Sequence, residues 1–419
     1  MRKQEICIVT QSHPSMNPRL VKEADALVEA GYKVSVIAPD FSDFWRKADE
    51  EFLSRFWRVV ERPRFGPLAP AGIRMAELAR RFVAGIAVKN FRIMHPVVVR
   101  AALHPVAPAL ISAAKRCKAD LYIAHYPAAL PAAAIAAQLY GALYAYDAED
   151  FHPGDLPDAP EYEAEHRMIR SIEGLYLSGC CYVTAAAPLI AQAYRDEYQI
   201  ELPTTLLNVF PLSQSPHGPT PRGTASPGPS VYWFSQTIGP GRGLECAVKA
   251  IGLANTKPHL YLRGHPADGF LETLRAIAAK VGVSDRVHVL PLAAPSEMER
   301  LAAAYDIGFV GETGDTRNHR IMLSNKQFTY LQAGLPVAMS DVPSHRAFAA
   351  GHEASVRTFC TGDERSLAET FDDLLESPEG LATAREHAFW LGQKKFNWDI
   401  EKRTLLQTVE KALQAGVAR

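Results

Sequence analysis

The run Ile6-Cys7-Ile8-Val9-Thr10 is followed by a loop of residues 11–17, a segment that opens with Pro18, and the run Lys33-Val34-Ser35-Val36-Ile37-Ala38. Both runs are short, apolar and rich in β-branched residues, which is typical of buried parallel strands. Pro18 favours the first turn of a helix, and Gly31 indicates where that helix ends. This strand–helix–strand unit predicts a parallel sheet covered by helices, which is an α/β fold.

The same alternation continues on both sides of one proline-rich segment. Further strands are expected at 120–124, 143–146, 182–185, 230–234, 260–263, 287–289, 307–310 and 337–339. Six prolines between Pro211 and Pro229 disfavour helices and central strands, so this segment is predicted to be an interdomain linker. We therefore predict a first domain at 1–210, the linker at 211–229, a second domain at 230–395 and a terminal helix at 396–419.

The composition restricts the class of protein. The chain has 419 residues, of which 47% are hydrophobic and 22% charged, as expected for a soluble protein of two or three domains. A net charge of -1 argues against a generally basic nucleic-acid binder. The six cysteines include no C-x-x-C pair, so neither a zinc site nor a disulfide framework is expected, and a reducing cytosol fits best. The N-terminus lacks the apolar core of a signal peptide.

Three segments need a separate assessment for membrane contact. The uncharged stretches 121–146 and 174–194 are interrupted by prolines and rich in alanine, so we predict no transmembrane helix. Residues 51–118 carry thirteen Arg and Lys residues against three Glu residues, a local net charge of +10. Large apolar residues alternate with these cations, which suits a helix lying on an anionic membrane. An equally good interpretation is a solvated basic surface whose apolar residues face the core.

A glycine-rich loop and a helix start predict an anion site in the second half. Gly239-Pro240-Gly241-Arg242-Gly243 lies between an expected strand and helix, so Gly241 and Gly243 permit close backbone approach while Arg242 adds positive charge. Such turns also occur without ligands. Ser324 can cap the helix that ends at Gly334, which puts Lys326 in its first turn. A lysine there opposes the helix dipole, and a bound diphosphate would resolve the conflict.

Polar residues at the ends of expected strands predict further site residues. His125 follows a strand at the edge where open α/β sheets bind ligands, although a buried structural histidine is the alternative. Asp147 and Glu149 follow the next strand and can orient sugar or acceptor hydroxyls, or form a plain acidic turn. The remaining candidates are His13 and Asn17 in the first loop and Glu312 after the strand at 307–310.

Several motifs, taken in order, resemble retaining glycosyltransferases of the GT-B fold, in particular the large family four. They are His13-Pro14-Ser15-Met16-Asn17-Pro18-Arg19-Leu20-Val21-Lys22-Glu23-Ala24, Asp120–His125, Tyr146–Asp150, Gly239–Glu245, Leu262-Arg263-Gly264, Asn318–Phe328 and Tyr330–Val337. The resemblance covers nearly all of the chain outside residues 51–118. Each motif is moderately specific, and the ordered set is strong.

The resemblance implies two facing Rossmann-like domains, with a C-terminal helix that crosses back to the first. It implies transfer of a sugar from a nucleotide-diphosphate donor to a glycan or lipid-linked acceptor, with retention and without a cofactor or metal. By the same resemblance, His125, Arg242 and Lys326 are the catalytic residues, and the donor is bound by Gly241, Gly243, Arg263, Glu312, Ser324 and Asn325. The residues expected to contact the acceptor or the sugar are His13, Asn17, Asp147 and Glu149. The implied setting is surface polysaccharide assembly by a cytoplasmic protein, peripheral at the inner face of the cell membrane, with no nucleic-acid partner.

The chain departs from the family pattern at several positions. Ile321 and Thr329 stand where many members carry a pair of glutamates, and Gln236 replaces a usual arginine. Glu149 stands where a histidine is frequent. A branch with Asn325-Lys326 in the nucleotide-sugar helix matches better. These departures leave two alternatives open, a nucleotide-sugar epimerase on the same scaffold and a catalytically degenerate protein that only binds sugar nucleotides.

Overall fold

The computed structural model describes residues 3–220 and 223–417, and these form two compact units. The first unit contains the chain up to Leu206 together with the segment from Lys402 onward, and the second runs from Leu207 to Glu401. Met1, Arg2, Pro221, Arg222, Ala418 and Arg419, which belong to the predicted first domain, linker and terminal helix, lie outside the described residues.

The first unit is built on a seven-stranded sheet in the order β3-β2-β1-β4-β5-β6-β7, with every neighbouring pair parallel. The strands are β1 (Glu5–Thr10), β2 (Lys33–Ile37), β3 (Arg58–Glu61), β4 (Leu121–His125), β5 (Leu143–Asp147), β6 (Val183–Ala185) and β7 (Thr204–Thr205). The central strand β4 is buried along its whole length, as its apolar sequence predicts. Thr10, His125 and Asp147 are in register on β1, β4 and β5, so their side chains start from the same edge of the sheet.

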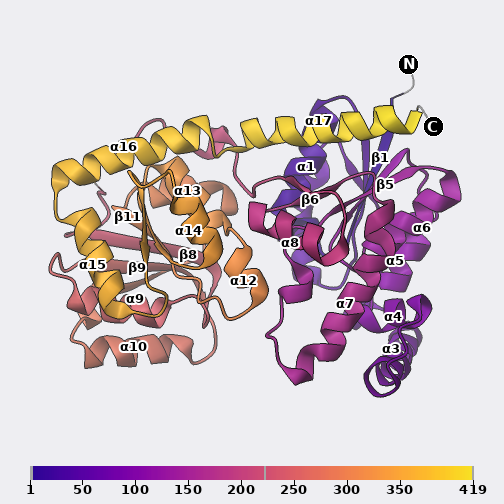
Figure 1. The fold of residues 1–419 in the computed structure, drawn as a ribbon, viewed down its shortest axis with the longest axis horizontal. Helices are drawn as coiled ribbons and strands as arrows, with labels where there is room; N and C mark the ends of the chain where they lie inside the picture. Colours follow the sequence, from indigo (N-terminus) through magenta and orange to yellow (C-terminus); the bar gives the residue numbers. More distant parts are fainter. Residues whose placement is uncertain (1–2, 221–222, 418–419) are drawn as a thin grey trace. The chain divides into compact units, whose positions relative to one another are not determined.

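Helices flank this sheet (Figure 1). They are α1 (Pro18–Glu29), α2 (Asp43–Ala48), α3 (Ala71–Phe91), α4 (Pro96–Leu103), α5 (Ala107–Ala114), α6 (Leu130–Tyr140), α7 (Glu163–Tyr176) and α8 (Pro188–Tyr198). The predicted start of the first helix is confirmed, because Pro18 is the first residue of α1 and the side chain of Asn17 accepts a hydrogen bond from the Leu20 amide. That cap fixes the loop between β1 and α1 at the carboxyl edge of the sheet.

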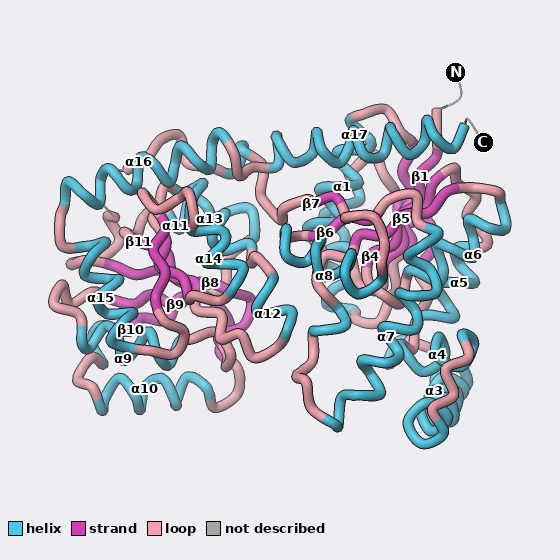
Figure 2. The backbone as a smooth tube through the Cα atoms, viewed as in Figure 1, coloured by secondary structure: helices cyan, strands magenta, loops and turns pink. Residues whose placement is uncertain are grey.

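The second unit has a six-stranded parallel sheet in the order β10-β9-β8-β11-β12-β13. Figure 2 shows its strands in magenta among cyan helices. The strands are β8 (Ser230–Ile238), β9 (His259–Pro266), β10 (Val287–Leu290), β11 (Ile307–Val310), β12 (Val337–Ser340) and β13 (Val356–Phe359). Its helices are α9 (Leu244–Leu253), α10 (Phe270–Lys280), α11 (Met298–Ala302), α12 (Arg317–Ile321), α13 (Asn325–Ala333), α14 (Pro343–Ala349), α15 (Glu364–Leu375) and α16 (Pro378–Lys394). Gly334 ends α13 in the left-handed conformation, as predicted.

The α/β prediction is therefore confirmed, and all ten expected strands are present. Three strands were not predicted, namely β3, β7 and β13. Each is short, contains polar or charged residues and lies at or next to a sheet edge, so it lacks the continuous apolar run by which buried strands are recognised.

The proline-rich segment packs against the second unit. The buried guanidinium of Arg385 donates to the Thr220 carbonyl at 2.6 Å, and the Gly223 amide donates to Asp306 at 2.7 Å. The terminal helix α17 (Trp398–Val417) begins in the second unit, where the Trp398 amide donates to the Phe210 carbonyl. Its later part belongs to the first unit and buries Leu405 and Val409.

Residues 51–118 form part of the first unit as β3, α3, α4 and α5. No single helix among residues 3–220 and 223–417 is long and apolar enough to cross a membrane. The pair α3 and α4 meets the length and composition criteria together, but the two helices are bent by 118° at their connection.

Candidate functional site

A buried group of charged side chains lies at the carboxyl edge of the first sheet. His125 lies between Glu23, at 2.7 Å from its Nε2, and Glu149, at 2.9 Å from its Nδ1. Arg19 donates two hydrogen bonds to Asp147, at 2.5 and 2.9 Å. The structure thus brings together the predicted residues His125, Asp147 and Glu149, which the chain supplies from the ends of β4 and β5.

The charges within this group determine the protonation of His125. Burial alone lowers its pKa, but hydrogen bonds to Glu149 and Glu23 outweigh that effect and raise the pKa to about 10. Burial raises the pKa of Asp147, yet the positive charges of Arg19 and His125 bring it below the ordinary value. The group therefore contains an imidazolium and a guanidinium among three carboxyl groups at neutral pH.

Two residues next to this group adopt strained backbone conformations. Tyr126 has φ 71° and Glu149 has φ 56°, both in the left-handed region that favours glycine. Asn17 donates from its side-chain amide to Glu149 at 2.7 Å, so three elements converge on that carboxylate. Strain of this kind persists where surrounding contacts hold it, and it concentrates at functional sites. The strand ends of the first unit are therefore a candidate binding site.

His13 is a predicted contact residue that lies in a different hydrogen-bond network. Its Nδ1 is 2.9 Å from Asp49, and its Nε2 accepts a hydrogen bond from the Phe41 amide at 3.4 Å. Asp49 also accepts from Arg62 at 2.8 Å. Burial raises the pKa of Asp49, but the hydrogen bonds from His13, Arg62 and Ser15 outweigh it and lower the pKa. Both ring nitrogens of His13 are thus engaged by the protein.

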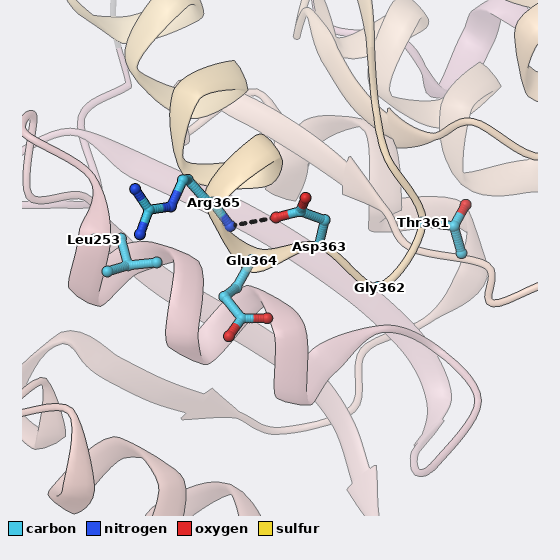
Figure 3. A pocket seen from close by; sticks show the side chains of 6 residues that line it. All are labelled: Leu253, Thr361, Gly362, Asp363, Glu364 and Arg365. Atoms are coloured by element: carbon cyan, nitrogen blue, oxygen red, sulfur yellow. Dashed lines mark hydrogen bonds between the residues drawn. The ribbon is translucent and has the colours of Figure 1, made fainter.

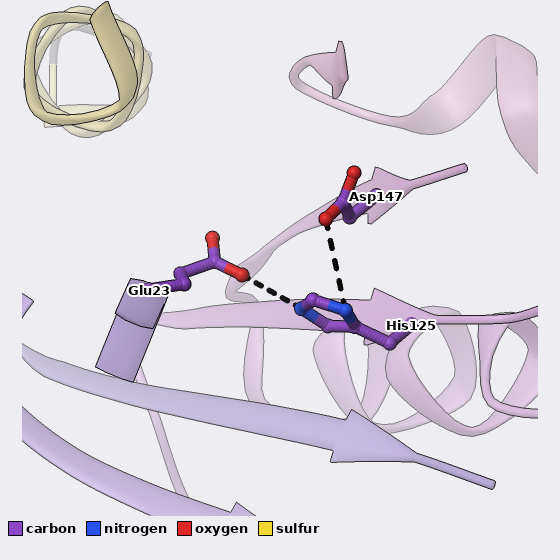
Figure 4. A group of neighbouring side chains, drawn as sticks. All are labelled: Glu23, His125 and Asp147. Carbon is purple, nitrogen blue, oxygen red and sulfur yellow. Dashed lines mark hydrogen bonds and ion pairs between the residues drawn. The ribbon is translucent and has the colours of Figure 1, made fainter. Parts of the chain in front are cut away.

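Glu23, His125 and Asp147 have the composition of a metal-ligand set (Figure 4). Each potential ligand atom lies within 4.8 Å of the others. Protein partners already engage all three side chains, because His125 lies between two carboxylates and Asp147 accepts from Arg19 and Thr184. The raised pKa keeps His125 protonated, so its ring has no free lone pair for a metal ion, and the positive charge of Arg19 repels a cation. The residues therefore fit an internal charge network better than a metal centre.

The glycine-rich loop of the second unit passes close to the backbone after β11. Gly241 and Gly243 have φ 74° and 66°, and a Cβ on Gly243 would stand 2.6 Å from the carbonyl oxygen of Gly311. Only glycine permits both the conformation and the approach. The loop therefore holds Arg242 beside the end of β11.

Lys326, in the first turn of α13, is buried beside that loop. Its Nζ lies 3.4 Å from Glu312 and 5.8 Å from the centre of the Trp233 ring. Burial lowers the pKa of Lys326, and the Arg242 charge adds to this against the attraction of Glu312. Burial raises the pKa of Glu312, but the charges of Lys326 and Arg242 bring it below the ordinary value. The predicted residues Arg242, Glu312 and Lys326 thus act electrostatically on one another.

Polar atoms without partners surround this group. Among the described residues, Glu312 Oε2, His319 Nδ1 and His345 Nε2 are buried and form no hydrogen bond. Burial lowers the pKa of His345 to about 4, so its imidazole is neutral. Its Nδ1 is 2.9 Å from the Ser340 carbonyl and donates to it, which leaves Nε2 as an acceptor. Unpaired buried atoms also occur elsewhere in the described residues, but here three of them lie with the charges of Lys326 and Arg242, and this combination makes the place a candidate ligand site.

The other predicted residues of the second unit are placed differently. Ser324 stands at the N-cap position of α13, but the predicted cap is wrong, because its hydroxyl bonds to Gln327 and leaves the helix amides without a side-chain cap. Asn325 is the first residue of that helix. Arg263 is buried and donates to the Tyr232 hydroxyl and to the Pro291 carbonyl, both at 2.8 Å. Arg263 therefore has a structural partner on each side.

His345, Arg19 and Glu23 are members of these two groups that the sequence did not single out for a role. His345 lies in α14, after β12, and no recognisable motif contains it. It is a candidate site residue only because the folded chain brings it close to Glu312. Arg19 and Glu23 appeared only as letters of the first motif. Their spacing of four residues on one helix, with a histidine at a strand end, was the available signal.

A shallow hollow of about 570 Å³ elsewhere on the second unit contains none of these residues (Figure 3). It is lined by Leu253 and by residues 361–365 at the start of α15. Asp363 caps that helix by accepting from the Arg365 and Ser366 amides at 2.9 and 3.0 Å. Its carboxylate is thus used for structure, and the hollow is not the candidate site.

No protein-family model and no curated protein matches the chain. Solved structures do match. HepE of Anabaena in complex with UDP is 15% identical with a TM-score of 0.68, covering 97% of this chain and 100% of that one. Sucrose-phosphate synthase from Thermosynechococcus elongatus is 13% identical with a TM-score of 0.74, covering 99% and 100%. WaaG, a glycosyltransferase of lipopolysaccharide biosynthesis, is 12% identical with a TM-score of 0.60, covering 96% and 98%.

These matches cover nearly all of each chain, so they include both units. The chain has the GT-B fold, as the sequence predicts. At such low identity the similarity establishes the fold, and the chemistry has to be argued from the residues of the site.

Proposed function

We propose that the protein is a glycosyltransferase that takes a sugar from a nucleotide-diphosphate donor. The observation that carries this proposal is the group of buried polar atoms without partners around Lys326 and Arg242 in the second unit. It combines two cations with the acceptor atoms Glu312 Oε2 and His345 Nε2. The cations can bind a diphosphate, and the acceptor atoms can receive hydrogen bonds from sugar hydroxyls. A sugar nucleotide contains both a diphosphate and sugar hydroxyls, so it matches both features. HepE, whose fold this chain shares, crystallises with UDP and with UDP-glucose.

The demanding step in such a reaction is departure of the nucleotide diphosphate, on whose oxygen negative charge grows. Lys326 and Arg242 are placed to stabilise that charge, together with the amides of α13 that Ser324 leaves uncapped. Preorganised donors of this kind contribute about a hundredfold to a thousandfold each to the rate. The family resemblance implies a reaction without a required metal ion, and the proposal relies on the protein's own cations.

We assign the acceptor side to the strand ends of the first unit. Glu149 receives hydrogen bonds from Asn17 and His125 and is held in a strained conformation, which suits a carboxylate that must keep a fixed orientation. His125 is completely buried with both nitrogens engaged, so in this proposal it acts by holding Glu149. Asp147 in turn is fixed by Arg19.

Retention of configuration, a glycan or lipid-linked acceptor and a place in surface polysaccharide assembly complete the proposal. They rest on the family resemblance, as does a cytoplasmic location at the inner face of the membrane. The departures at Ile321 and Thr329 support a degenerate sugar-nucleotide binder as the second candidate. Thr329 is fully buried and bonds to Glu299 at 2.9 Å, so its position serves the interior.

One experiment separates these functions. The purified chain is incubated with a panel of nucleotide sugars, with and without lipid-linked and free glycan acceptors, and the products are identified by mass spectrometry. A transferase releases nucleoside diphosphate and extends an acceptor, an epimerase changes the donor without an acceptor, and a degenerate binder gives neither. His345→Ala is expected to weaken donor binding, whereas His217→Ala, at an exposed position of the same unit, serves as the matched control. Turnover unchanged by His345→Ala would contradict the placement of the donor.

A further inference from the structure

Helix α3 carries large apolar side chains on its solvent side. Met75, Leu78, Phe82, Val83 and Ile86, here called the α3 apolar face, have exposed fractions of 64%, 54%, 70%, 65% and 37%. Their spacing of three, four and one residues places them on one side of the helix. Isolated exposed apolar residues are ordinary on protein surfaces, but a continuous stripe of this kind indicates a partner.

The opposite side of α3 is already covered by the protein. Ala84 and Val88 are buried in a small cluster with Val99 and Ala102 of α4 and with Met168 and Ile172 of α7. A salt bridge of 2.8 Å between Lys89 and Glu165 also ties α3 to α7. Figure 1 shows α3 and α4 together beside α7, apart from the strands of the sheet. The apolar face of α3 is therefore not a core-facing surface, whereas Trp57 and Val99 of the same segment 51–118 are buried.

Positive charge borders the apolar face. Arg74, Arg81 and Arg92 are exposed, and within residues 3–220 and 223–417 they form no ion pair. The only acidic residue in the sequence from 71 to 118 is Glu77, which is buried. At a spacing of about 100° per residue, Arg74 and Arg81 fall between the buried stripe and the apolar face, and Arg92 follows the last residue of the helix. Residues 71–118 thus combine exposed apolar side chains with cations and contribute no exposed carboxylate.

We propose that α3 docks on an anionic lipid bilayer, lying in the interface with its apolar face inserted and its arginines at the headgroups. An anionic bilayer matches both features, since apolar side chains enter the acyl boundary while cations remain at the charged surface. A second copy of the chain fits less well, because a symmetric α3–α3 contact would bring the arginines of both copies together. The docking concerns the first unit alone and does not depend on the transfer reaction.

The test is flotation of the full chain with phosphatidylcholine vesicles at low and high salt. One set of vesicles contains about 30 mol% phosphatidylglycerol as the anionic lipid, and the other set contains none. Binding is expected only with the anionic lipid and is expected to weaken as salt screens the charges. Changing Arg74, Arg81 and Arg92 together to Gln should lower vesicle affinity by about fivefold per residue. The matched control is the change of Lys257, Arg275 and Lys280 to Gln, at exposed positions of the second unit.

A second pair of variants tests the apolar contribution. Phe82→Ser should reduce flotation at least tenfold, whereas Trp390→Ser, at an aromatic position with an exposed fraction of 55%, should leave it unchanged. Both side chains are exposed, so thermal melting should remain as in the wild type. The proposal is overturned if the wild type stays soluble with anionic vesicles at low salt, or if the control variants lose as much binding. A dimer that dissociates when Phe82 is changed, without vesicle binding, would assign the face to a second copy instead.

Discussion

Replacing Lys326 by methionine tests the proposed donor site directly. The substitution keeps the length of the side chain and removes its charge. Glu312 then loses the cation at 3.4 Å, and Arg242 is the largest remaining positive charge that acts on it. Because Lys326 is buried, the effect has two parts, one on stability and one on the reaction.

The stability part follows from the buried ion pair. Removing one partner of a buried ion pair costs about 3–5 kcal/mol of unfolding free energy. Lys326 and Glu312 share one contact of 3.4 Å, which is long, so we expect a cost of about 3 kcal/mol. Adding Glu312→Gln neutralises the abandoned carboxylate, so the double variant should recover most of the lost free energy of unfolding. The catalytic part is the loss of a preorganised donor, about a hundredfold to a thousandfold in kcat.

The effects on stability and on catalysis can be measured separately, because the double variant Lys326→Met, Glu312→Gln is expected to be stable and still lacks the lysine charge. Urea unfolding measures the free energy, and chromatographic assay of nucleoside diphosphate release with acceptor measures kcat. Glu312→Gln alone is the reference for activity, and Lys280→Met, at an exposed position of α10, is the control for removing a lysine. A double variant that retains kcat within tenfold of Glu312→Gln would refute the assignment of Lys326 to the leaving group.

Three further outcomes are expected. The folded pKa of His125, about 10, exceeds its unfolded value of about 6.5, so its stabilisation of the first unit, on the order of 5 kcal/mol, is complete below about pH 6.5 and is lost as the pH rises through about 10. His125→Gln should flatten that part of a stability–pH curve, and an unchanged curve would argue against the imidazolium. Leu405→Ala in α17 should lower the stability of the first unit by about 2–4 kcal/mol, as measured by proteolysis of that unit, whereas Leu139→Ala at an exposed position should have little effect. Gly243→Ala should destabilise the second unit and weaken nucleotide binding, because its Cβ meets the Gly311 carbonyl. Gly269 is also a left-handed N-cap, with φ 73° against 66° for Gly243, but it has open space around it, so Gly269→Ala should cost only about 1 kcal/mol. Equal effects of the two changes would show that the close approach is unimportant.

Local sequence patterns predicted most of the architecture. The apolar, β-branched runs identified ten strands because a strand buried on both faces must be continuously apolar. They missed the short edge strands β3, β7 and β13. The charged residues of β3 and β13 are tolerated because edge strands stay partly exposed. Among the site residues, a family motif indicated Lys326 and a position after a strand indicated Glu312. Nothing local marked His345, which comes close to Glu312 only in the folded chain.

The cap assigned to Ser324 shows a limit of local reasoning. Its position at the start of α13 was correct, but its hydroxyl has a nearby competitor in Gln327, and sequence alone cannot rank the two hydrogen bonds. His125 shows another limit. A histidine at a strand end is easily recognised, but its partners Glu23 and Glu149 come from α1 and from the turn after β5, and they decide whether it carries a proton.

The sequence by itself determined the α/β class, the positions of the central strands, the glycine-rich loop and the charge of residues 51–118, because these depend on side-chain type and spacing along the chain. Only the tertiary structure decided which polar atoms lack partners, which pKa values shift and which side of α3 is exposed. Burial and electrostatic energy depend on what surrounds a group in three dimensions, and residues distant in sequence supply those surroundings.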